Sequence, residues 1–244
     1  MRPLSPAELL AAWEQGSTAP AYGRTFALLA AACPDLSLEA ISQLSVGQRD
    51  ARLLRLREWT FGSQLLSVAN CFSCGERLEW SVNTTDLRVD PEETPAGEMA
   101  LDVGAYSVRF RLPNSLDVAV VAETSDRATA GAALLERCVL EARLENREIE
   151  ANELSLDVTI AIARRMGEVD PQADVQLDLS CPACGHRWQA LLDIEHFFWT
   201  ELNAWAKRLL SEVHVLASAY GWREADILNL SPLRRQHYLD LVSG

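Results

Sequence analysis

The chain has 244 residues, and 48% of them are hydrophobic, which is enough to bury a core as one large domain or as two small ones. Lys and Arg total 22 against 35 Asp and Glu, so the formal net charge is −13 and generic binding to a nucleic-acid backbone is not expected. The longest apolar run near the N-terminus, residues 26–33, is too short to span a bilayer, and the opening residues lack the layout of a secretory signal. We therefore expect a cytoplasmic protein without a membrane span.

The N-terminal third of the sequence predicts helices. Ser5-Pro6-Ala7-Glu8 is a capping box with proline at the first helical position, and this helix should end near Gly16. A second box, Ser45-Val46-Gly47-Gln48, begins an arginine-rich helix with an apolar stripe that Gly62 should end. This helix leads the chain into the first of two cysteine motifs.

The middle of the sequence predicts short strands followed by helices. Strand patterns lie at 77–82, 98–103 and 107–112, with an acidic loop at 90–97 and a hairpin turn at 104–106. Apolar residues at intervals of three and four predict helices at 114–123, 127–144 and 153–166. Two further strand patterns, at 174–179 and 186–192, flank the second cysteine motif.

The C-terminal part predicts helices again. The longest helical pattern runs from 194 to 220, Gly221 ends it, a short helix follows at 222–228, and Ser231-Pro232 begins a last one. The predicted fold class is α+β, mostly helical, with a small antiparallel sheet organised around a split four-cysteine zinc ribbon. We divide the chain into an N-terminal helical region (1–66), a split zinc-ribbon module (67–193) and a C-terminal helical segment (194–244).

Four of the six cysteines form two matching pairs, Cys71-Phe-Ser-Cys74-Gly75 and Cys181-Pro-Ala-Cys184-Gly185. In such a C-x-x-C-G turn, called a knuckle below, both thiolates point to one side, and the glycine supplies a positive φ that lets backbone N–H groups approach the sulfurs. The pattern favours metal over a disulfide framework. We predict one tetrahedral zinc site with Cys71, Cys74, Cys181 and Cys184 as ligands, with a structural role because four thiolates leave no open coordination position.

The 106 residues between Cys74 and Cys181 exceed the roughly 15 to 20 of a compact zinc ribbon. A sixfold longer connection costs only about 1.5 kcal/mol of loop-closure entropy. Structural zinc supplies roughly 10 to 16 kcal/mol in small peptides, so the metal outweighs the longer loop. Redox-active C-x-x-C pairs and separate metal sites remain alternatives, and His186 could replace a thiolate, although a surface position on the following strand is the simpler interpretation.

The sequence lacks the local motifs of common enzyme classes. No P-loop, G-x-G-x-x-G, H-E-x-x-H or G-x-S-x-G occurs in it. His196 and His214 stand near acidic residues, but positions one or two apart on a helix do not face each other. Cys33 and Cys138 lie in apolar settings, where a buried, inert thiol is the usual role. We therefore expect a protein that is not an enzyme.

The C-terminal segment combines aromatic, apolar and basic side chains. Such a tail either packs on its own chain or presents an interaction surface to another protein. The candidate partner-binding residues are Trp222, Leu230, Leu233, Arg234, Arg235 and Tyr238.

Several segments together resemble one protein family. They are the arginine-rich helix into Phe61-Gly62, the knuckles with their flanks in 71–80 and 181–188, Arg111-Leu-Pro-Asn-Ser-Leu-Asp117, and the segments 212–222, 227–235 and 238–241. From about residue 45 to its end, the chain resembles the baseplate hub assembly chaperone family of T-even contractile phages, in the zinc-knuckle form found with bacterial contractile injection systems. The knuckles are generic, whereas the C-terminal series is the more specific part of the resemblance.

The resemblance implies an assembly chaperone or structural component of the baseplate hub of a phage-tail-like contractile injection system, with hub and spike proteins as partners. It is also compatible with two locations for the protein, the cytoplasm and the assembled injection particle. From the residues alone, a zinc-ribbon module that binds nucleic acid or acts in transcription is the alternative, and it would need a basic or aromatic face. A metalloenzyme would need an open position on the metal.

Overall fold

The structure is a computed structural model that describes residues 1–89, 97–122, 124 and 126–243. The expected acidic loop at 90–97 lies outside the described residues except for Gly97. The chain divides into two compact units, Met1–Ser37 with Asp193–Gly244, and Leu38–Leu192. Among the described residues, no helix is both long enough and apolar enough to cross a membrane.

The first unit is built from helices at the two ends of the chain. They are α1 (Pro6–Ser17), α2 (Ala21–Ala32), α9 (Ile194–Tyr220), α10 (Glu224–Leu228) and α11 (Pro232–Ser243). Its core joins Leu10 of α1 to leucine and valine side chains of α9 and to Ile227 and Leu228 of α10. The indole N–H of Trp13 donates to the Asn203 side chain at 3.1 Å. The N-terminal helices are therefore covered by the long C-terminal helix.

The predicted helix ends of this unit are confirmed. Ser5 and Glu8 form both hydrogen bonds of the capping box at the start of α1. Gly221 follows α9 in the left-handed conformation, with φ of 68°, and its N–H donates to the Ala217 carbonyl.

The second unit begins with α3 (Leu38–Ser42) and α4 (Val46–Phe61), the hairpin β1 (Gln64–Asn70) and β2 (Arg77–Asn83), and the short helix α5 (Thr84–Leu87). The predicted capping box at Ser45 and Gln48 begins α4, and Gly62 ends it with φ of 91°. Strand β1 was not expected from the sequence. Its apolar residues Leu66 and Val68 face solvent, so the alternation that marks a half-buried strand is hidden.

The inserted stretch folds around a four-stranded antiparallel sheet with the strand order β3-β4-β5-β6. The strands are β3 (Glu98–Val103), β4 (Tyr106–Arg111), β5 (Val139–Leu144) and β6 (Arg147–Ile149), joined by α6 (Ser115–Val121) and α7 (Arg127–Cys138), and followed by η1 (Ala151–Glu153) and α8 (Leu156–Val169). Phe110 of β4 and Ile149 of β6 pack with Val158 and Ile162 of α8 in one core. The insertion thus has a hydrophobic core of its own.

The predicted single helix over 127–144 is wrong. The helix ends at Cys138, and the next six residues form β5, which pairs antiparallel with β4. Apolar residues keep a helical spacing across this junction, so periodicity alone does not reveal it. The turn after β5 places Glu145 and Asn146 at positive φ, which closes the β5–β6 hairpin.

The chain then returns through η2 (Pro171–Asp174) to a second hairpin, β7 (Gln176–Ser180) and β8 (Arg187–Leu191). The fold is α+β, as predicted, with small antiparallel sheets. The sheets are arranged differently from the prediction, because each knuckle ends a separate two-stranded sheet and the four-stranded sheet stands apart from the cysteines. The division into 1–66, 67–193 and 194–244 remains a prediction.

Candidate metal centre

The two hairpins end in knuckles with the same local geometry. In the first, the N–H of Cys71 donates to the Glu76 carbonyl at 2.8 Å and the N–H of Gly75 to the Cys71 carbonyl at 2.9 Å. The second knuckle repeats both bonds, with the same lengths, at Cys181 and Gly185. The two glycines have φ of 77° and 73°, where a side chain would be strained. The sequence motif therefore folds each pair of thiols onto one side of a tight turn.

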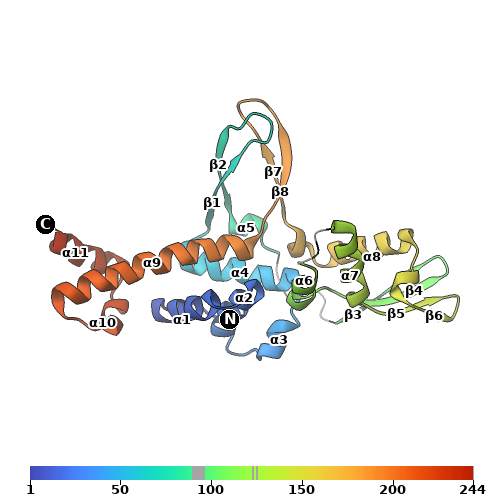
Figure 1. Ribbon diagram of the computed structural model, residues 1–244, viewed down its shortest axis with the longest axis horizontal. Coiled ribbons are helices and arrows are strands. Elements are labelled where there is room, and N and C mark those ends of the chain that lie inside the picture. The colour runs from blue at the N-terminus through green and yellow to red at the C-terminus, as the bar shows by residue number, and fades with distance from the viewer. Residues whose placement is uncertain (90–96, 123, 125, 244) are drawn as a thin grey trace. The chain divides into compact units, whose positions relative to one another are not determined.

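The structure brings the two knuckles together. In Figure 1 the hairpins β1–β2 and β7–β8 rise side by side from the region of α4 and α5, and we call them, with their knuckles, the arm (residues 64–83 and 176–191). The Sγ atoms of Cys71 and Cys184 are 3.7 Å apart, and those of Cys74 and Cys181 are 3.6 Å apart. All four sulfurs lie within 4.8 Å of one another.

This spacing fits a four-coordinate metal ion. A metal–sulfur bond of about 2.3 Å places the sulfurs of a tetrahedron about 3.8 Å apart. The first cysteine of each knuckle is buried and the second is exposed, so the cluster lies at the surface. The four cysteines could therefore hold a metal ion within reach of a chelator.

The pKa values of the thiols reflect their crowding. Burial raises the pKa of the Cys71 thiol, but the backbone N–H groups of Cys74 and Ser73 outweigh burial and lower it to about 7. The N–H of Glu76 lowers the pKa of Cys74, but the neighbouring thiols, Cys184 first, and burial raise it to about 12. The thiols that surround Cys74 therefore oppose its ionisation, because they hydrogen-bond to it in its neutral form.

Partly buried polar contacts hold the base of the arm. Glu58 of α4 accepts from the Thr84 hydroxyl at 3.0 Å and from Arg88 at 2.8 Å, which fixes the end of the first hairpin. The N–H of Val89 donates to the side chain of Gln172 in η2 at 2.7 Å, which ties that end to the start of the second hairpin. The two hairpins are thus joined at their base as well as at their tips.

A second contact ties η2 to α4. The Asp170 carboxylate accepts from the N–H of Gly47, in the first turn of α4, at 2.9 Å. Burial raises the pKa of Asp170, although the Gly47 N–H and the Ser45 hydroxyl act in the opposite direction. This contact brings the end of the insertion back to the helix that precedes the first hairpin.

The remaining cysteines and histidines stand apart from the cluster. Cys33 and Cys138 are buried, as expected, and burial raises the pKa of Cys138 to about 11. His186 is exposed, and its ring stacks on Trp188 with 5.6 Å between centroids. His196 and His214 lie exposed on α9. The metal-ligand cluster of the described residues therefore consists of sulfur alone.

The predicted partner-binding residues at the C-terminus divide into two groups. Arg235 is buried and donates to the Glu212 carboxylate at 2.9 Å and to the Leu230 carbonyl at 2.8 Å. Trp222 and Tyr238 pack edge to face at 4.8 Å. These residues, with half-buried Leu230, hold α11 in place, whereas Leu233 and Arg234 are exposed.

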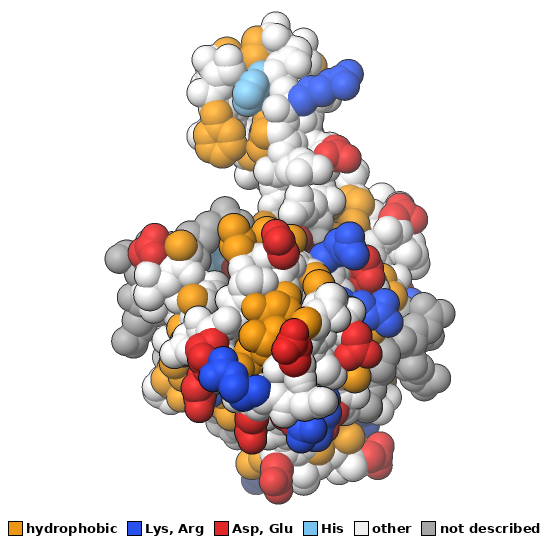
Figure 2. Space-filling model, turned by 90° about the vertical axis from the view of Figure 1, so that its right-hand side faces the viewer, with side chains coloured by type: hydrophobic (Ala, Val, Ile, Leu, Met, Phe, Trp, Pro, Cys, Tyr) orange, Lys and Arg blue, Asp and Glu red, His pale blue; other side chains and the backbone are white. Residues whose placement is uncertain are grey.

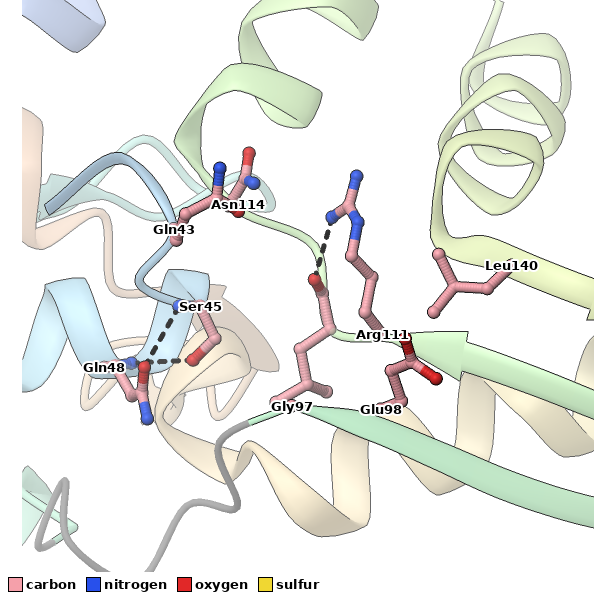
Figure 3. A pocket seen from close by; sticks show the side chains of 9 residues that line it. Gln43, Ser45, Gln48, Gly97, Glu98, Arg111, Asn114 and Leu140 are labelled. Atoms are coloured by element: carbon pink, nitrogen blue, oxygen red, sulfur yellow. Dashed lines mark hydrogen bonds between the residues drawn. The ribbon is translucent and has the colours of Figure 1, made fainter. Parts of the chain in front are cut away.

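The second unit also contains a cavity of about 360 Å³ between α4, β3 and β4, shown in Figure 3. Its polar groups serve local structure: Gln48 accepts from the N–H of Ser45, and Arg111 donates to the Leu112 carbonyl. Glu98, at its edge, is paired with Arg109. No histidine or cysteine is among the described residues that line it, so it offers no nucleophile with an adjacent base.

Sequence reasoning missed one exposed feature of the arm. Phe72, the second residue of the first knuckle, is 83% exposed and contacts Trp188 of the other hairpin edge to face at 5.8 Å. The sequence does contain a signal for it. Phe72 stands between two candidate metal ligands, a position where the turn does not need an apolar side chain.

A comparison with known protein families assigns the chain to one of them. The family of T4 bacteriophage base plate proteins matches residues 9–199, which is most of the sequence, and the chain belongs to this family. The match includes both knuckles and ends within α9, so the C-terminal series of the resemblance lies beyond it. No curated protein matches the chain, and no solved structure does.

Proposed function

We propose that the chain is a non-enzymatic assembly chaperone or structural component of the baseplate hub in a phage-tail-like contractile injection system. Membership of the T4 base plate family is the observation that carries this proposal, since it supports a structural role in a baseplate and partners within it. A cluster of four thiols supports a structural site, because it leaves a bound metal no position for substrate.

Zinc is the metal that we propose for the four cysteines. A tetrahedral site of sulfur ligands suits Zn²⁺, which has no redox chemistry and forms short bonds to thiolates. Its contribution here would be to join the tips of the two hairpins. Cys71 and Cys74 would hold it from one hairpin, and Cys181 and Cys184 from the other.

The C-terminal helix α11 offers a surface for hub or spike proteins. Leu233 is 71% exposed and Leu241 is 73% exposed, although both lie on a helix whose other residues anchor it to α9 and α10. Exposed leucines on a helix that is already held in place can bind a partner with little loss of conformational entropy. These two residues are the partner contacts that we propose for this segment.

Co-purification with hub and spike proteins tests the proposal. Deleting residues 222–244 would remove Ile227 and Leu228 from the core, so surface substitutions are the better probe. We expect the wild-type chain to recover the hub and spike proteins, and Leu233→Asp with Leu241→Asp to recover about tenfold less. Leu156→Asp, at an equally exposed leucine of α8, is the matched control and should recover as much as wild type. Failure of the wild-type chain to recover either partner would refute the hub assignment.

A further inference from the structure

The four cysteines of the cluster differ in their access to solvent. Cys71 and Cys181, the first cysteines of the two knuckles, are buried, whereas Cys74 and Cys184, the second ones, are exposed. Figure 2 shows the end of the arm as a projection that is open to solvent. Because oxidation of a thiol follows its exposure, a dissolved oxidant reaches the second cysteine of each knuckle first.

Each exposed thiol contacts a buried thiol of the other hairpin. The Sγ atom of Cys74 lies 3.6 Å from that of Cys181, and the Sγ atom of Cys184 lies 3.7 Å from that of Cys71. A disulfide bond holds its sulfurs about 2.05 Å apart, so each pair has to approach by about 1.6 Å. Both contacts therefore place a thiol that can complete a disulfide beside a thiol that an oxidant can reach.

The backbone of the knuckles favours bonds between the hairpins over bonds within one knuckle. Two backbone hydrogen bonds hold each turn, from the N–H of Cys71 and of Gly75 in the first knuckle and from the N–H of Cys181 and of Gly185 in the second. A bond within one knuckle would have to draw together two residues of a turn that these hydrogen bonds fix. A bond between the hairpins leaves both turns as they are.

We propose that the cluster is also a peroxide-sensitive site, which closes into the disulfide bonds Cys74–Cys181 and Cys71–Cys184. Hydrogen peroxide first oxidises the exposed thiol to a sulfenic acid, and one water leaves. The buried thiol then attacks this sulfur: the S–S bond forms, the S–O bond breaks, and the hydroxyl group leaves with the thiol proton as a second water. Each disulfide thus takes two electrons from two thiols and reduces one peroxide to two waters.

These disulfides would keep the tips of the arm joined without a metal. Thiolates and not disulfides are the ligands of a metal ion, so oxidation would release the proposed zinc ion. Because each disulfide joins one hairpin to the other, the arm would stay closed after this release. The inference depends on the sulfur positions and not on the baseplate role, so the two can fail separately.

Disulfide mapping of the full chain after treatment with hydrogen peroxide is the first part of the test. Trypsin leaves the cysteines of the first knuckle on the peptide 58–77 and those of the second on the peptide 166–187. We expect these two peptides to be joined until a reductant is added, in a chain that remains a monomer on a non-reducing gel. Tandem mass spectrometry should show the two proposed pairs. Cys33 and Cys138, which are buried elsewhere, should stay reduced and serve as internal controls.

Two matched double variants, both studied without metal, test the pairing. Cys71→Ser with Cys184→Ser leaves the contact pair that contains Cys74, and Cys71→Ser with Cys181→Ser leaves the two exposed thiols. With peroxide and dimedone, which traps sulfenic acids, we expect the first variant to form its disulfide and the second to carry about tenfold more dimedone adduct. Equal trapping in both, or a disulfide between the two exposed thiols, would overturn the proposed pairing.

Amide hydrogen exchange tests whether the disulfides hold the arm closed. Residues 64–83 and 176–191 of the peroxide-treated chain should exchange more slowly than those of a chain treated with chelator alone. Exchange as fast as in the chelator-treated chain would overturn this role. Disulfides within one knuckle, disulfides between two chains, or thiols that do not form disulfides at all would overturn the inference as a whole, and the baseplate role would remain in place.

Discussion

At the scale of single residues, Asp117 shows how a polar motif can stabilise the fold. Its side chain is 1% exposed and accepts from Arg111, from Arg137 at 2.9 Å and from the N–H of Asn114 at 3.0 Å. Arg111 and Asn114 belong to the Arg-Leu-Pro-Asn-Ser-Leu-Asp segment on which the family resemblance partly depends. The segment therefore caps helix α6, and the Asp117 carboxylate forms ion pairs with Arg111 and Arg137. These contacts join β4 to α6 and α7.

Replacement of Asp117 by Asn should destabilise the second unit. The variant leaves two guanidinium groups without their carboxylate. Because both are partly exposed, we expect a loss somewhat below the roughly 3 to 5 kcal/mol of a fully buried pair, about 2 to 3 kcal/mol of unfolding free energy at pH 7. Urea unfolding followed by circular dichroism measures it. The neighbouring exposed substitution Val120→Ala is the control and should change stability little, and a similar loss in both variants would contradict the assigned role.

The same carboxylate predicts a pH dependence. Burial raises the pKa of Asp117, but the Arg111 guanidinium, the Asn114 N–H and Arg137 outweigh it and hold the pKa below its ordinary value. The stabilisation is therefore complete above the unfolded pKa of about 3.9 and is lost as the pH falls through the folded pKa. We expect the difference in unfolding free energy between wild type and Asp117→Asn to narrow below about pH 4. A difference that stays constant between pH 7 and pH 3 would show that the ion pair contributes nothing.

At the scale of elements, the contact between η2 and α4 depends on Gly47. A Cβ atom at this position would lie 2.0 Å from the Asp170 Oδ1 atom and 2.9 Å from the backbone nitrogen of Ala173. Gly47→Ala should therefore displace η2 from α4 and lower the free energy of unfolding by about 1 to 3 kcal/mol, measured by chemical denaturation. Gly167→Ala in α8 meets no atom within 4 Å and should be neutral or stabilise by about 0.5 to 1 kcal/mol. Equal effects of the two substitutions would count against this contact.

Elements with strong local signals could be predicted from the sequence, whereas those fixed by tertiary pairing could not. Capping boxes at Ser5 and Ser45 and the glycine at 221 gave the helix ends, because a cap is satisfied by residues a few positions away. Strands β1 and β5 were missed, since their apolar residues do not alternate and their partners lie elsewhere in the chain. The cysteines were found by their spacing, but the contact of Phe72 with Trp188 could not be predicted, because it forms only when the two hairpins lie together.

At the scale of the molecule, the arm is a pair of hairpins joined at both ends. Polar contacts of Glu58 and Gln172 hold its base, and the four sulfurs meet at its tips. This arrangement explains how a long insertion separates the knuckles without disturbing the site: the insertion has its own core, and its ends are held together at the base of the arm. Loop-closure entropy is then largely offset by folding of the insertion.

Removal of the proposed zinc ion should therefore loosen the tips and leave the base intact. After treatment with a chelator, we expect faster amide hydrogen exchange within residues 64–83 and 176–191, because their cross-link is lost. Exchange in the sheet β3-β4-β5-β6 should not change, since its core contains no metal ligand. Acceleration throughout the second unit would instead mean that the metal supports the whole unit.

X-ray absorption at the zinc edge, on protein purified without chelator, tests the central claim most directly. We predict one zinc ion per chain with four sulfur neighbours at about 2.3 Å and no nitrogen or oxygen in the first shell. A shell of two sulfurs with lighter atoms, two zinc ions per chain, or no bound zinc would contradict a single site shared by the two hairpins.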